Sequence, residues 1–485
     1  MKSGISPVGP GMPEKKGKKA LVAVIVVVIL IAAGGLTAYE LLKPPTTTSS
    51  KITITVWGSG SPGGEAEVFN SSMVAFEKAY PNITIDDSPA VGIASTTYLS
   101  AAHAGKAPDV YRDTSDNAGT LYAAGAIQNL RPMLNSSYID SFTNGTIKDW
   151  TLNGGFYGIP VNTNGVGLYY NKAYVTTPPT TIYQLIQEAE TITKDNPGVY
   201  GLAYGLGTDD GYRSAAWFPA FGGTIFNLTT QMPELNSAAD ISAVSLLYNL
   251  TYVYKVSPQG LTTMSSQCDL FEEGKTAFIV EGPWDQAEFT KALGSNLGVT
   301  ALPYNNVTHD WPEPIWGSVG YVISTHVASG ITSAQTWASL QFIKFETNYT
   351  AQKELFAKAG DFPSLKSVAR DITSETSIDP LIAGWLDQEN HTQIQPSFVN
   401  MNYYWPNFGT LVGNLYDNGT NNVTAVMDSL QSAVLSEIHE EASVVSGYPY
   451  LIASQIPTQL NPLINISYFN NNLIAYATNS NIFIF

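Results

Sequence analysis

A glycine-rich turn near the start of the predicted fold is the first candidate for chemistry. Gly58, Gly60 and Gly63 form the pattern Gly-x-Gly-x-x-Gly between a predicted strand and a predicted helix, and Asp86-Asp87 stand at the end of the next strand. In dinucleotide-binding proteins such a turn approaches the pyrophosphate, and the acid binds the ribose. The N-terminus, however, predicts that the chain is exported, and a nicotinamide cofactor is not expected outside the cytoplasm. A glycine-rich turn can also border the site of any other ligand. We therefore reject the dinucleotide interpretation.

Catalytic and metal-binding patterns are weak throughout the chain. Paired acids such as Asp209-Asp210 and Glu272-Glu273 could supply two carboxyls for glycoside hydrolysis, but adjacent side chains usually point apart into solvent. The five histidines show no His-Glu-x-x-His motif or other close ligand spacing, and there is no Gly-x-Ser-x-Gly elbow. Cys268 is the single cysteine, which excludes an intrachain disulfide and a cysteine metal site. We expect no catalytic residue, no metal and no cofactor.

Aromatic, hydroxyl and amide side chains near strand ends suit the binding of a sugar better than catalysis. The C–H faces of a sugar pack on aromatic rings, and its hydroxyls need donors and acceptors that stay paired when buried. In open α/β sheets, ligands lie at the carboxyl ends of the strands. Trp57-Gly58-Ser59-Gly60 follows the first predicted strand and would present a hydroxyl and free amide groups at a helix N-terminus.

The hydrophobic pattern predicts the strands and helices that would position these side chains. Ile52, Ile54 and Val56 alternate with threonines, which is typical of a strand. Apolar residues at 4-3-4 spacing then predict a helix over 65–80, which Pro81 ends. A second strand pattern follows, so the rhythm indicates an α/β fold with parallel sheets. Further strands are expected at 107–112, 165–170, 277–281 and 319–324, and the clearest later helix spans 423–438.

Length and composition allow two globular domains and argue against nucleic acid as a partner. The 485 residues are enough for two cores, and 44% of them are hydrophobic. Charged residues make up only 13%, against roughly 25% in an average soluble domain. The net charge of −17 would repel a phosphate backbone, so no nucleic-acid partner is expected. Twelve Asn-x-Ser/Thr sequons fit an extracytoplasmic surface that can carry N-glycans.

The N-terminus predicts the compartment. Residues 20–39 carry no charge, and their number matches the ~20 residues needed to cross a bilayer. Lys15, Lys16, Lys18 and Lys19 lie directly before them, so the positive-inside rule keeps 1–19 in the cytoplasm and places the body outside. We expect a transmembrane anchor or signal at 20–42, a linker at 43–50, and a single-pass protein of the cell membrane with an extracellular body. A cleaved signal peptide is the alternative, whereas the junction at 19–21 resembles archaeal pilin-type leaders, which keep the apolar helix.

Several short motifs occur in a fixed order along the chain. The most specific is Phe271–Trp284 (FEEGKTAFIVEGPW), which Gly298–Pro303 (GVTALP) follows. The others are Gly105–Val110 (GKAPDV), Tyr157–Pro160 (YGIP), Leu168–Lys172 (LYYNK), Gly360–Pro363 (GDFP) and Tyr403–Phe408 (YYWPNF). Together, over about 51–443, they resemble the maltose-binding-protein family of extracellular solute-binding proteins (importer family 1), the receptors of sugar ABC importers.

The resemblance implies a two-lobed α/β fold of the periplasmic-binding-protein type (type II), each lobe a mostly parallel sheet flanked by helices. Lobe 1 would be 51–163 with 306–363, and lobe 2 would be 166–300 with 366–443. A sugar, either a mono- or an oligosaccharide, would lie between the lobes, and the receptor would deliver it to an ABC permease in the membrane. The rivals are a structural cell-surface or filament subunit that keeps this fold and an extracellular glycoside-active enzyme.

The resemblance also implies which residues would touch the ligand. Asp116 occupies a turn where the family has a sugar-binding Asp followed by a basic residue, but this chain has Asn117 there. Asn164 stands where maltose binders carry a carboxylate, which argues against maltose itself. The expected ligand-binding residues are Trp57, Ser59, Gly60, Asp116, Asn117, Asn164, Tyr212, Trp217, Trp284, Trp316, Gly317, Asp361, Tyr404 and Trp405. For each aromatic the alternative is core packing, and for Asp361 it is a solvated loop carboxylate.

The C-terminal segment differs from the rest in carrying no charge over its last 44 residues. Pro449, Pro457 and Pro462 exclude a membrane-spanning helix there. We expect 444–485 to be an uncharged C-terminal extension. It would be either an extra strand on lobe 2 or an assembly element, because the β-prone end 481–485 (NIFIF) needs a partner.

Overall fold

The computed structural model describes residues 51–447, apart from 59, 61–62, 88–93, 208–209, 262, 326–329, 375–378 and 420, together with the segments 475–478 and 481–484. The anchor expected at 20–42, the linker, and most of the C-terminal extension lie outside the described residues. None of the helices in the described part is both long and apolar enough to cross a membrane.

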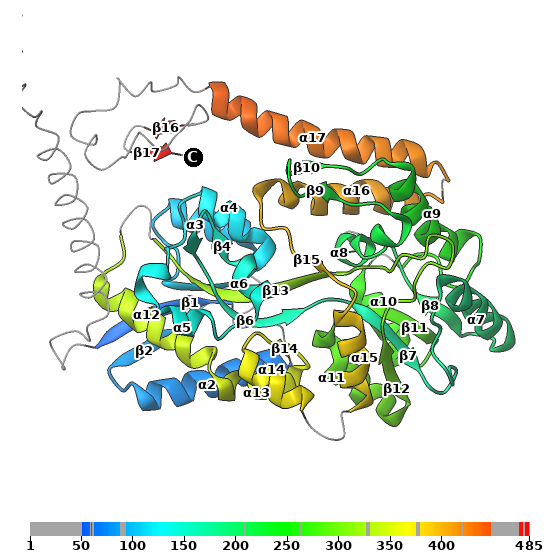
Figure 1. Cartoon of the computed structure of the whole chain (residues 1–485), viewed down its shortest axis with the longest axis horizontal. Coiled ribbons are helices and arrows are strands. Elements are labelled where there is room, and N and C mark those ends of the chain that lie inside the picture. Colours follow the sequence, from blue (N-terminus) through cyan, green and yellow to red (C-terminus); the bar gives the residue numbers. More distant parts are fainter. Residues whose placement is uncertain are drawn as a thin grey trace, which may run out of the picture.

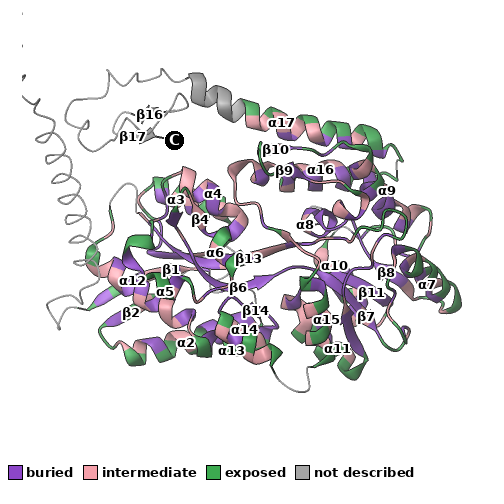
Figure 2. Cartoon of the chain, viewed as in Figure 1, coloured by how far each residue is buried: buried purple, intermediate pink, exposed green. Residues whose placement is uncertain are grey.

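Two hydrophobic cores define two lobes that lie side by side (Figure 1). The core of lobe 1 is formed by residues within 52–161 and 321–368. The main core of lobe 2 is formed mostly by residues within 166–302 and 401–434. The strands of both sheets are largely buried between their helices (Figure 2). A third, smaller cluster joins residues of the lobe 2 sheet, such as Tyr169 and Ile279, to Phe362 of lobe 1. The lobe bounds expected from the sequence stay a prediction.

Lobe 1 is built on a sheet of mixed direction. Its strands are β1 (Ile52–Trp57), β2 (Ile83–Asp86), β3 (Val110–Thr114), β6 (Ile159–Asn164), β13 (Ile315–Ile323), β14 (Phe362–Pro363) and β15 (Gln393–Ile394). Their order is β14-β6-β13-β3-β1-β2, with β15 on β13. β1 runs parallel to β2 and β3, whereas β13 runs antiparallel to β3 and β6.

Lobe 2 has a smaller sheet, and it corrects one expectation. Its strands are β7 (Gly167–Asn171), β8 (Tyr200–Ala203), β11 (Thr276–Glu281) and β12 (Leu297–Thr300), in the order β12-β7-β11-β8. β8 and β11 are parallel, but β7 is antiparallel to both its neighbours. The expectation of mostly parallel sheets is therefore wrong. The chain enters lobe 2 from lobe 1 at β7 and returns to lobe 1 at β13. Both strands therefore start at the junction between the lobes and are antiparallel to neighbouring strands that end there.

Helices pack on both sheets, and several have strong sequence signals at their starts. In lobe 1 they are α2 (Gly64–Ala79), α3 (Ser95–His103), α4 (Ala118–Ala123), α5 (Ser136–Ile139), α6 (Asn144–Asp149), α12 (Ser333–Glu346), α13 (Tyr349–Ala359) and α14 (Lys366–Thr373). In lobe 2 they are α7 (Ile182–Asp195), α8 (Gly211–Ala215), α9 (Ala238–Tyr252), α10 (Met264–Glu272), α11 (Gln286–Leu293), α15 (Pro380–Glu389), α16 (Tyr404–Asp417) and α17 (Val423–Gly447). Capping boxes at Thr181, Ser237 and Thr332 begin α7, α9 and α12. The helix expected at 423–438 is confirmed as part of α17.

Three short antiparallel ribbons complete the described fold. They are β4 (Thr151–Leu152) with β5 (Gly155–Phe156), β9 (Phe226–Asn227) with β10 (Met232–Pro233), and β16 (Ala475–Thr478) with β17 (Asn481–Ile484). The crossing between the lobes matters more for function. There the end of β6 lies beside the start of β13, since Asn164 pairs with Gly317.

Candidate functional site

Three aromatic side chains of lobe 2 form one group at the junction between the lobes, which we name the aromatic trio: Tyr212, Trp284 and Trp405. The Tyr212 ring lies 6.3 Å from each of the two indole rings, tilted by 49° and 55°. The three come from α8, from the short helix η4 (Pro283–Asp285) after β11, and from the first turn of α16. Gly282 leaves room for them, because a Cβ there would lie 2.2 Å from the Trp284 ring. All three residues are partly exposed.

The aromatic trio is bonded to both the opposite lobe and the crossing strands. Trp405 donates its Nε1–H to Oδ2 of Asp116 over 3.1 Å. Asp116 lies in the short helix η1 (Ser115–Asn117), directly after β3 of lobe 1. The Tyr212 hydroxyl donates to the carbonyl of Ile315 over 2.7 Å and lies 3.3 Å from that of Asn164. An aromatic surface from lobe 2 and a carboxylate from lobe 1 therefore meet at one place.

Asn117 lies beside Asp116 but uses its amide within the turn. Its Nδ2 donates to Oδ1 of Asp113 over 3.1 Å and lies 3.2 Å from the Thr114 hydroxyl. Through these two contacts the Asn117 side chain stabilises the turn that contains Asp116.

Asn164 and Asp361 form a buried pair at the end of β6. Asn164 Nδ2 donates to Asp361 Oδ1 over 2.7 Å, and Asn164 Oδ1 accepts from the Phe362 amide over 3.1 Å. Asp361 is only 1% exposed, so the alternative of a solvated loop carboxylate is wrong. Burial, and then the charge of Glu65, raise the pKa of Asp361 well above its ordinary value. Burial therefore favours the protonated form of Asp361, whose Oδ1 accepts from Asn164.

The glycine-rich turn after β1 wraps around an ion pair between Arg112 and Glu65. Gly58 and Gly60 have φ of 92° and 96°, a backbone conformation that favours glycine. A Cβ on Gly60 would lie 2.8 Å from the Glu65 Cβ, so the turn needs this glycine for space as well. Trp57 precedes the turn and is half-buried. Ser59 lies outside the described residues.

Not every expected residue joins the aromatic trio. Trp217 is 1% exposed inside the core of lobe 2, and Tyr404 is fully buried, with its hydroxyl donating to the Gly211 carbonyl over 3.2 Å. Tyr404 packs edge-on behind Trp405, with the ring centroids 5.0 Å apart. Trp316 is half-buried on β13 and packs against Phe362 at 6.1 Å, next to Gly317. The structure thus brings Tyr212, Trp284, Trp405 and Asp116 together, with Asn164 bonded beneath them.

Buried acids near the junction were missed by the sequence reasoning. Asp149, at the end of α6, is 2% exposed, and its Oδ2 accepts from the Ser318 hydroxyl over 2.6 Å. Burial raises the pKa of Asp149 to about 7. Burial, and then the charge of Asp116, raise the pKa of Asp113 to about 8. No local signal marks Asp149, because only the tertiary fold brings it to Ser318.

A second buried acid group lies in lobe 2 behind Trp284. Arg213 contacts Asp210 over 2.8 Å and Glu281 over 3.5 Å. Ligand atoms of Cys268, Glu281 and Asp285 lie within 4.8 Å of one another, close enough among the described residues to hold a metal ion. Two features oppose metal binding: burial raises the pKa of the Cys268 thiol, and the Arg213 guanidinium already neutralises Glu281.

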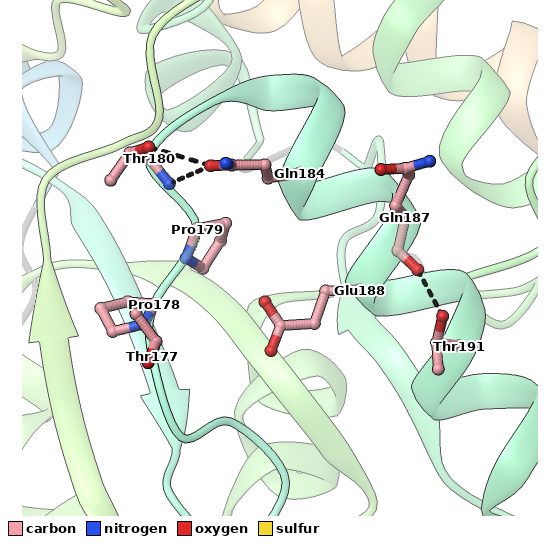
Figure 3. Close-up of a pocket in the computed structure, with 8 residues that line it drawn as sticks. All are labelled: Thr177, Pro178, Pro179, Thr180, Gln184, Gln187, Glu188 and Thr191. Carbon is pink, nitrogen blue, oxygen red and sulfur yellow. Dashed lines mark hydrogen bonds between the residues drawn. The ribbon is translucent and has the colours of Figure 1, made fainter.

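A surface depression of ≈ 490 Å³ lies apart from the aromatic trio, at the start of α7. It is bordered by Thr177, Pro178, Pro179, Thr180, Gln184, Gln187, Glu188 and Thr191 (Figure 3). The Gln184 side chain is already bonded to Thr180, as part of the start of this helix. None of the described residues that border the depression is aromatic.

Two α/β lobes that meet at an aromatic surface define the class of two-lobed binding proteins. The chain matches the family described as bacterial extracellular solute-binding protein over residues 72–383. It belongs to this family of extracellular solute-binding proteins. The resemblance to this group expected from the sequence is thereby confirmed.

Relatives and solved structures agree with this assignment. The chain is 25% identical over 389 residues to the maltotriose-binding protein of Pyrococcus abyssi, covering 79% of this chain and 82% of that protein. It is 26% identical over 343 residues to a maltooligosaccharide ABC transporter solute-binding lipoprotein of Streptococcus pneumoniae, covering 68% and 77%. The fold matches the maltose/maltodextrin-binding domain MalE of Bdellovibrio bacteriovorus bound to maltotriose, with a TM-score of 0.70, 22% identity, and 80% and 100% of the two chains covered.

Proposed function

We propose that the chain is the substrate-binding receptor of an ABC importer and captures a sugar, a mono- or oligosaccharide, between its two lobes. The observation that carries the proposal is the aromatic trio, which faces Asp116 of the other lobe. Rings pack on the C–H faces of a sugar, and carboxylates and amides accept and donate to its hydroxyls. Relatives named for maltotriose and maltooligosaccharides support a carbohydrate ligand.

The mechanism in this proposal is hinged closure. An open form exposes the aromatic trio, and a ligand that touches both lobes stabilises the closed form by its higher affinity for that form. Trp405 and Tyr212 would sense the ligand directly, since they are bonded to lobe 1 and to the crossing strands. Trp57 and Asn164 would border the ligand, whereas Trp217 and Tyr404 would support it from the core. The receptor releases its cargo unchanged, so no covalent step is needed.

The same proposal places the body outside the cell. The segment 20–42 would anchor it as a single-pass helix beside the permease, and sequons on the body would carry N-glycans. A solute-binding lipoprotein among the relatives supports an extracellular body held at a membrane.

A calorimetric titration of the full-length protein, purified in detergent, tests the proposal. The ligands are maltotriose, maltose and tagatose, with a mixed dipeptide set and polyols for comparison. We expect saturable binding of at least one carbohydrate. Binding of dipeptides or polyols with no carbohydrate bound would contradict the proposal, as would new reducing ends released from an oligosaccharide.

A further inference from the structure

A hydrogen bond outside the aromatic trio also joins the two lobes. The Nδ2 of Asn402 donates to the Thr120 hydroxyl over 2.7 Å, although the two residues are 282 positions apart in the chain. Thr120 lies on α4, directly before Leu121 of the lobe 1 core. Asn402 lies in the short helix η6 (Val399–Tyr403), directly after Met401 of the lobe 2 core. Each end of the bond is therefore fixed to a different core.

This bond lies one helical turn away from the bond between Trp405 and Asp116. Asn402 precedes Trp405 by three residues, where η6 continues into α16, and Thr120 follows Asp116 by four, where η1 continues into α4. Side chains three or four positions apart lie on the same face of a helix. One helical segment of each lobe therefore faces the other with two hydrogen bonds between them.

The backbones of the two lobes also touch beside these bonds. Gly119 precedes Thr120 on α4, and a Cβ there would lie 2.1 Å from the carbonyl oxygen of Ser397, which leads into η6. The Ser397 hydroxyl donates to the Asp149 carbonyl of lobe 1 over 3.1 Å. In the proposed hinged motion, opening separates α4 from η6, so the bond from Asn402 to Thr120 forms only while the lobes are closed.

Only one of the two hydrogen bonds belongs to the proposed ligand site. Asp116 and Trp405 are both expected to touch the sugar, so a bound sugar can compete for the carboxylate that accepts from the indole. Asn402 and Thr120 are partly buried and are not among the expected ligand residues. Their bond can therefore hold the lobes together both before and after the sugar enters.

We propose that the hydrogen bond from Asn402 to Thr120 is an interlobe latch, which raises the population of the closed form and prolongs the stay of a bound sugar. This inference rests on the proposed function as a two-lobed receptor and assigns part of its affinity to residues that do not touch the ligand. A bond made only in the closed form favours that form. The apparent affinity is the intrinsic affinity of the competent form multiplied by its population.

Variants on either side of the latch test it in the full-length protein. Asn402→Ala and Thr120→Val each remove one partner, whereas Thr120→Ser keeps the hydroxyl and should bind as the parent does. The probe is maltotriose, or maltose or tagatose where that sugar binds more tightly. For each of the first two variants we expect about fivefold weaker binding by calorimetry. Stopped-flow tryptophan fluorescence should assign the loss to faster dissociation, with the association rate unchanged.

The double variant Asn402→Ala/Thr120→Val shows whether the two side chains act through one bond. If they do, the second substitution removes nothing further, so the double variant should lose about fivefold in affinity and not the product of two separate losses. Thr120→Val also gives an independent reading from the other lobe if Asn402→Ala does not fold, which circular dichroism shows.

X-ray scattering without any sugar gives a readout that does not depend on the ligand. Asn402→Ala and Thr120→Val should both have a larger radius of gyration than the parent, because the open form gains population. Asn400→Ala is the matched control. The Nδ2 of Asn400 donates to the Gln231 carbonyl over 2.8 Å, a bond of the same kind that stays inside lobe 2. This control should keep the radius and the affinity of the parent.

These measurements separate the latch from the proposed function. Unchanged radius and dissociation rate in Asn402→Ala and Thr120→Val would overturn the latch, as would independent losses that multiply in the double variant. A loss in Asn400→Ala as large as that in Asn402→Ala would show that the integrity of η6, and not a bond between the lobes, sets the affinity. If no carbohydrate binds to the parent, the proposed function fails, and the scattering alone then decides whether the latch exists.

Discussion

Trp405 combines a binding surface and a link between the lobes in one side chain. Its ring belongs to the aromatic trio, and its Nε1–H donates to Asp116. Trp405→Phe keeps an aromatic face but removes the donor. We expect about tenfold weaker carbohydrate binding, because a hydrogen bond to a charged group contributes roughly 1.5–3 kcal/mol. Titration calorimetry with the best-bound sugar measures the change.

The control for this variant is Trp337→Phe, which alters a half-buried tryptophan on α12 of lobe 1. Circular dichroism should show both variants folded. If Trp337→Phe weakens binding as much as Trp405→Phe does, the loss is a general effect on the fold, and the role of Trp405 is wrong.

Asp361 is a buried acid whose neutral form suits its surroundings. Asp361→Asn keeps an oxygen that can accept from Asn164 but replaces the titrating carboxyl with an amide, which does not ionise. We expect the variant to have the melting temperature of the parent near pH 4 and a higher one near pH 8, because ionisation of the buried carboxyl destabilises only the parent. Asp361→Ala removes the acceptor together with the titrating group, so it should cost about 1–3 kcal/mol near pH 4 and less near pH 8. Thermal melts of the three proteins decide between these outcomes.

At the scale of elements, α4 of lobe 1 touches the segment that leads into α16 of lobe 2. A Cβ on Gly119 of α4 would lie 2.1 Å from the Ser397 carbonyl oxygen and 3.0 Å from the Phe398 Cα. Both neighbours are backbone atoms, so they cannot rotate away. Gly119→Ala should therefore push the two elements apart and favour the open form. We expect a larger radius of gyration by X-ray scattering and about tenfold weaker binding.

Gly145→Ala is a matched control for Gly119→Ala. Gly145 also lies in a helix of lobe 1, but a Cβ there meets nothing within 4 Å. This variant should keep the scattering profile and the affinity of the parent. A Gly119→Ala protein with the parent radius and affinity would show that the contact with Ser397 does not control closure.

The elements show how far local sequence patterns reach. Alternation at Ile52, Ile54 and Val56 predicted β1, and the apolar stripe from Val423 predicted α17, because each pattern depends only on nearby residues. Strand direction could not be predicted in this way. A strand buried on both faces, such as β11, has the same apolar run in a parallel or an antiparallel sheet. The direction follows from where the chain re-enters each lobe.

The candidate site also contains residues that local motifs predict and residues that only the tertiary fold brings together. Trp284 and Trp405 were found through motifs that span a strand end and a turn, and the structure brings both to Tyr212. Trp217 has the same residue type, but its burial depends on packing by distant helices. Asp149 was missed because its neighbour Ser318 is 169 residues away in the chain. Tertiary contacts of this kind leave no local pattern.

At the scale of the whole molecule, buried acids outnumber the buried cations among the residues that the structure describes. Burial raises the pKa of Asp149 to about 7, and the pKa of Asp113 and of Glu346 to about 8. In the unfolded chain these groups ionise near pH 4. The folded protein therefore holds protons that the unfolded chain releases, in a molecule whose net charge is already −17.

This difference sets the pH dependence of stability. A group whose pKa is raised on folding stabilises the protein fully below its unfolded pKa, and that stabilisation is lost as the pH rises through the folded value. For Asp113, Asp149 and Glu346 the loss falls between about pH 4 and pH 8. We expect the melting temperature, measured by calorimetry at constant ionic strength, to be highest near pH 4 and at least about 5 °C lower near pH 8.

A triple variant tests whether these three acids cause the decline of the melting temperature with pH. Asp113→Asn, Asp149→Asn and Glu346→Gln together remove the three groups and should flatten the decline between pH 4 and pH 8, since an amide does not titrate. Ion pairs such as Arg112 with Glu65 act in the opposite direction, because a paired carboxylate stabilises the fold as it ionises. A melting temperature that rises from pH 5 to pH 8 in the parent would mean that these pairs outweigh the buried acids. The receptor would then be suited to a neutral medium, whereas the expected decline suits it to an acidic one.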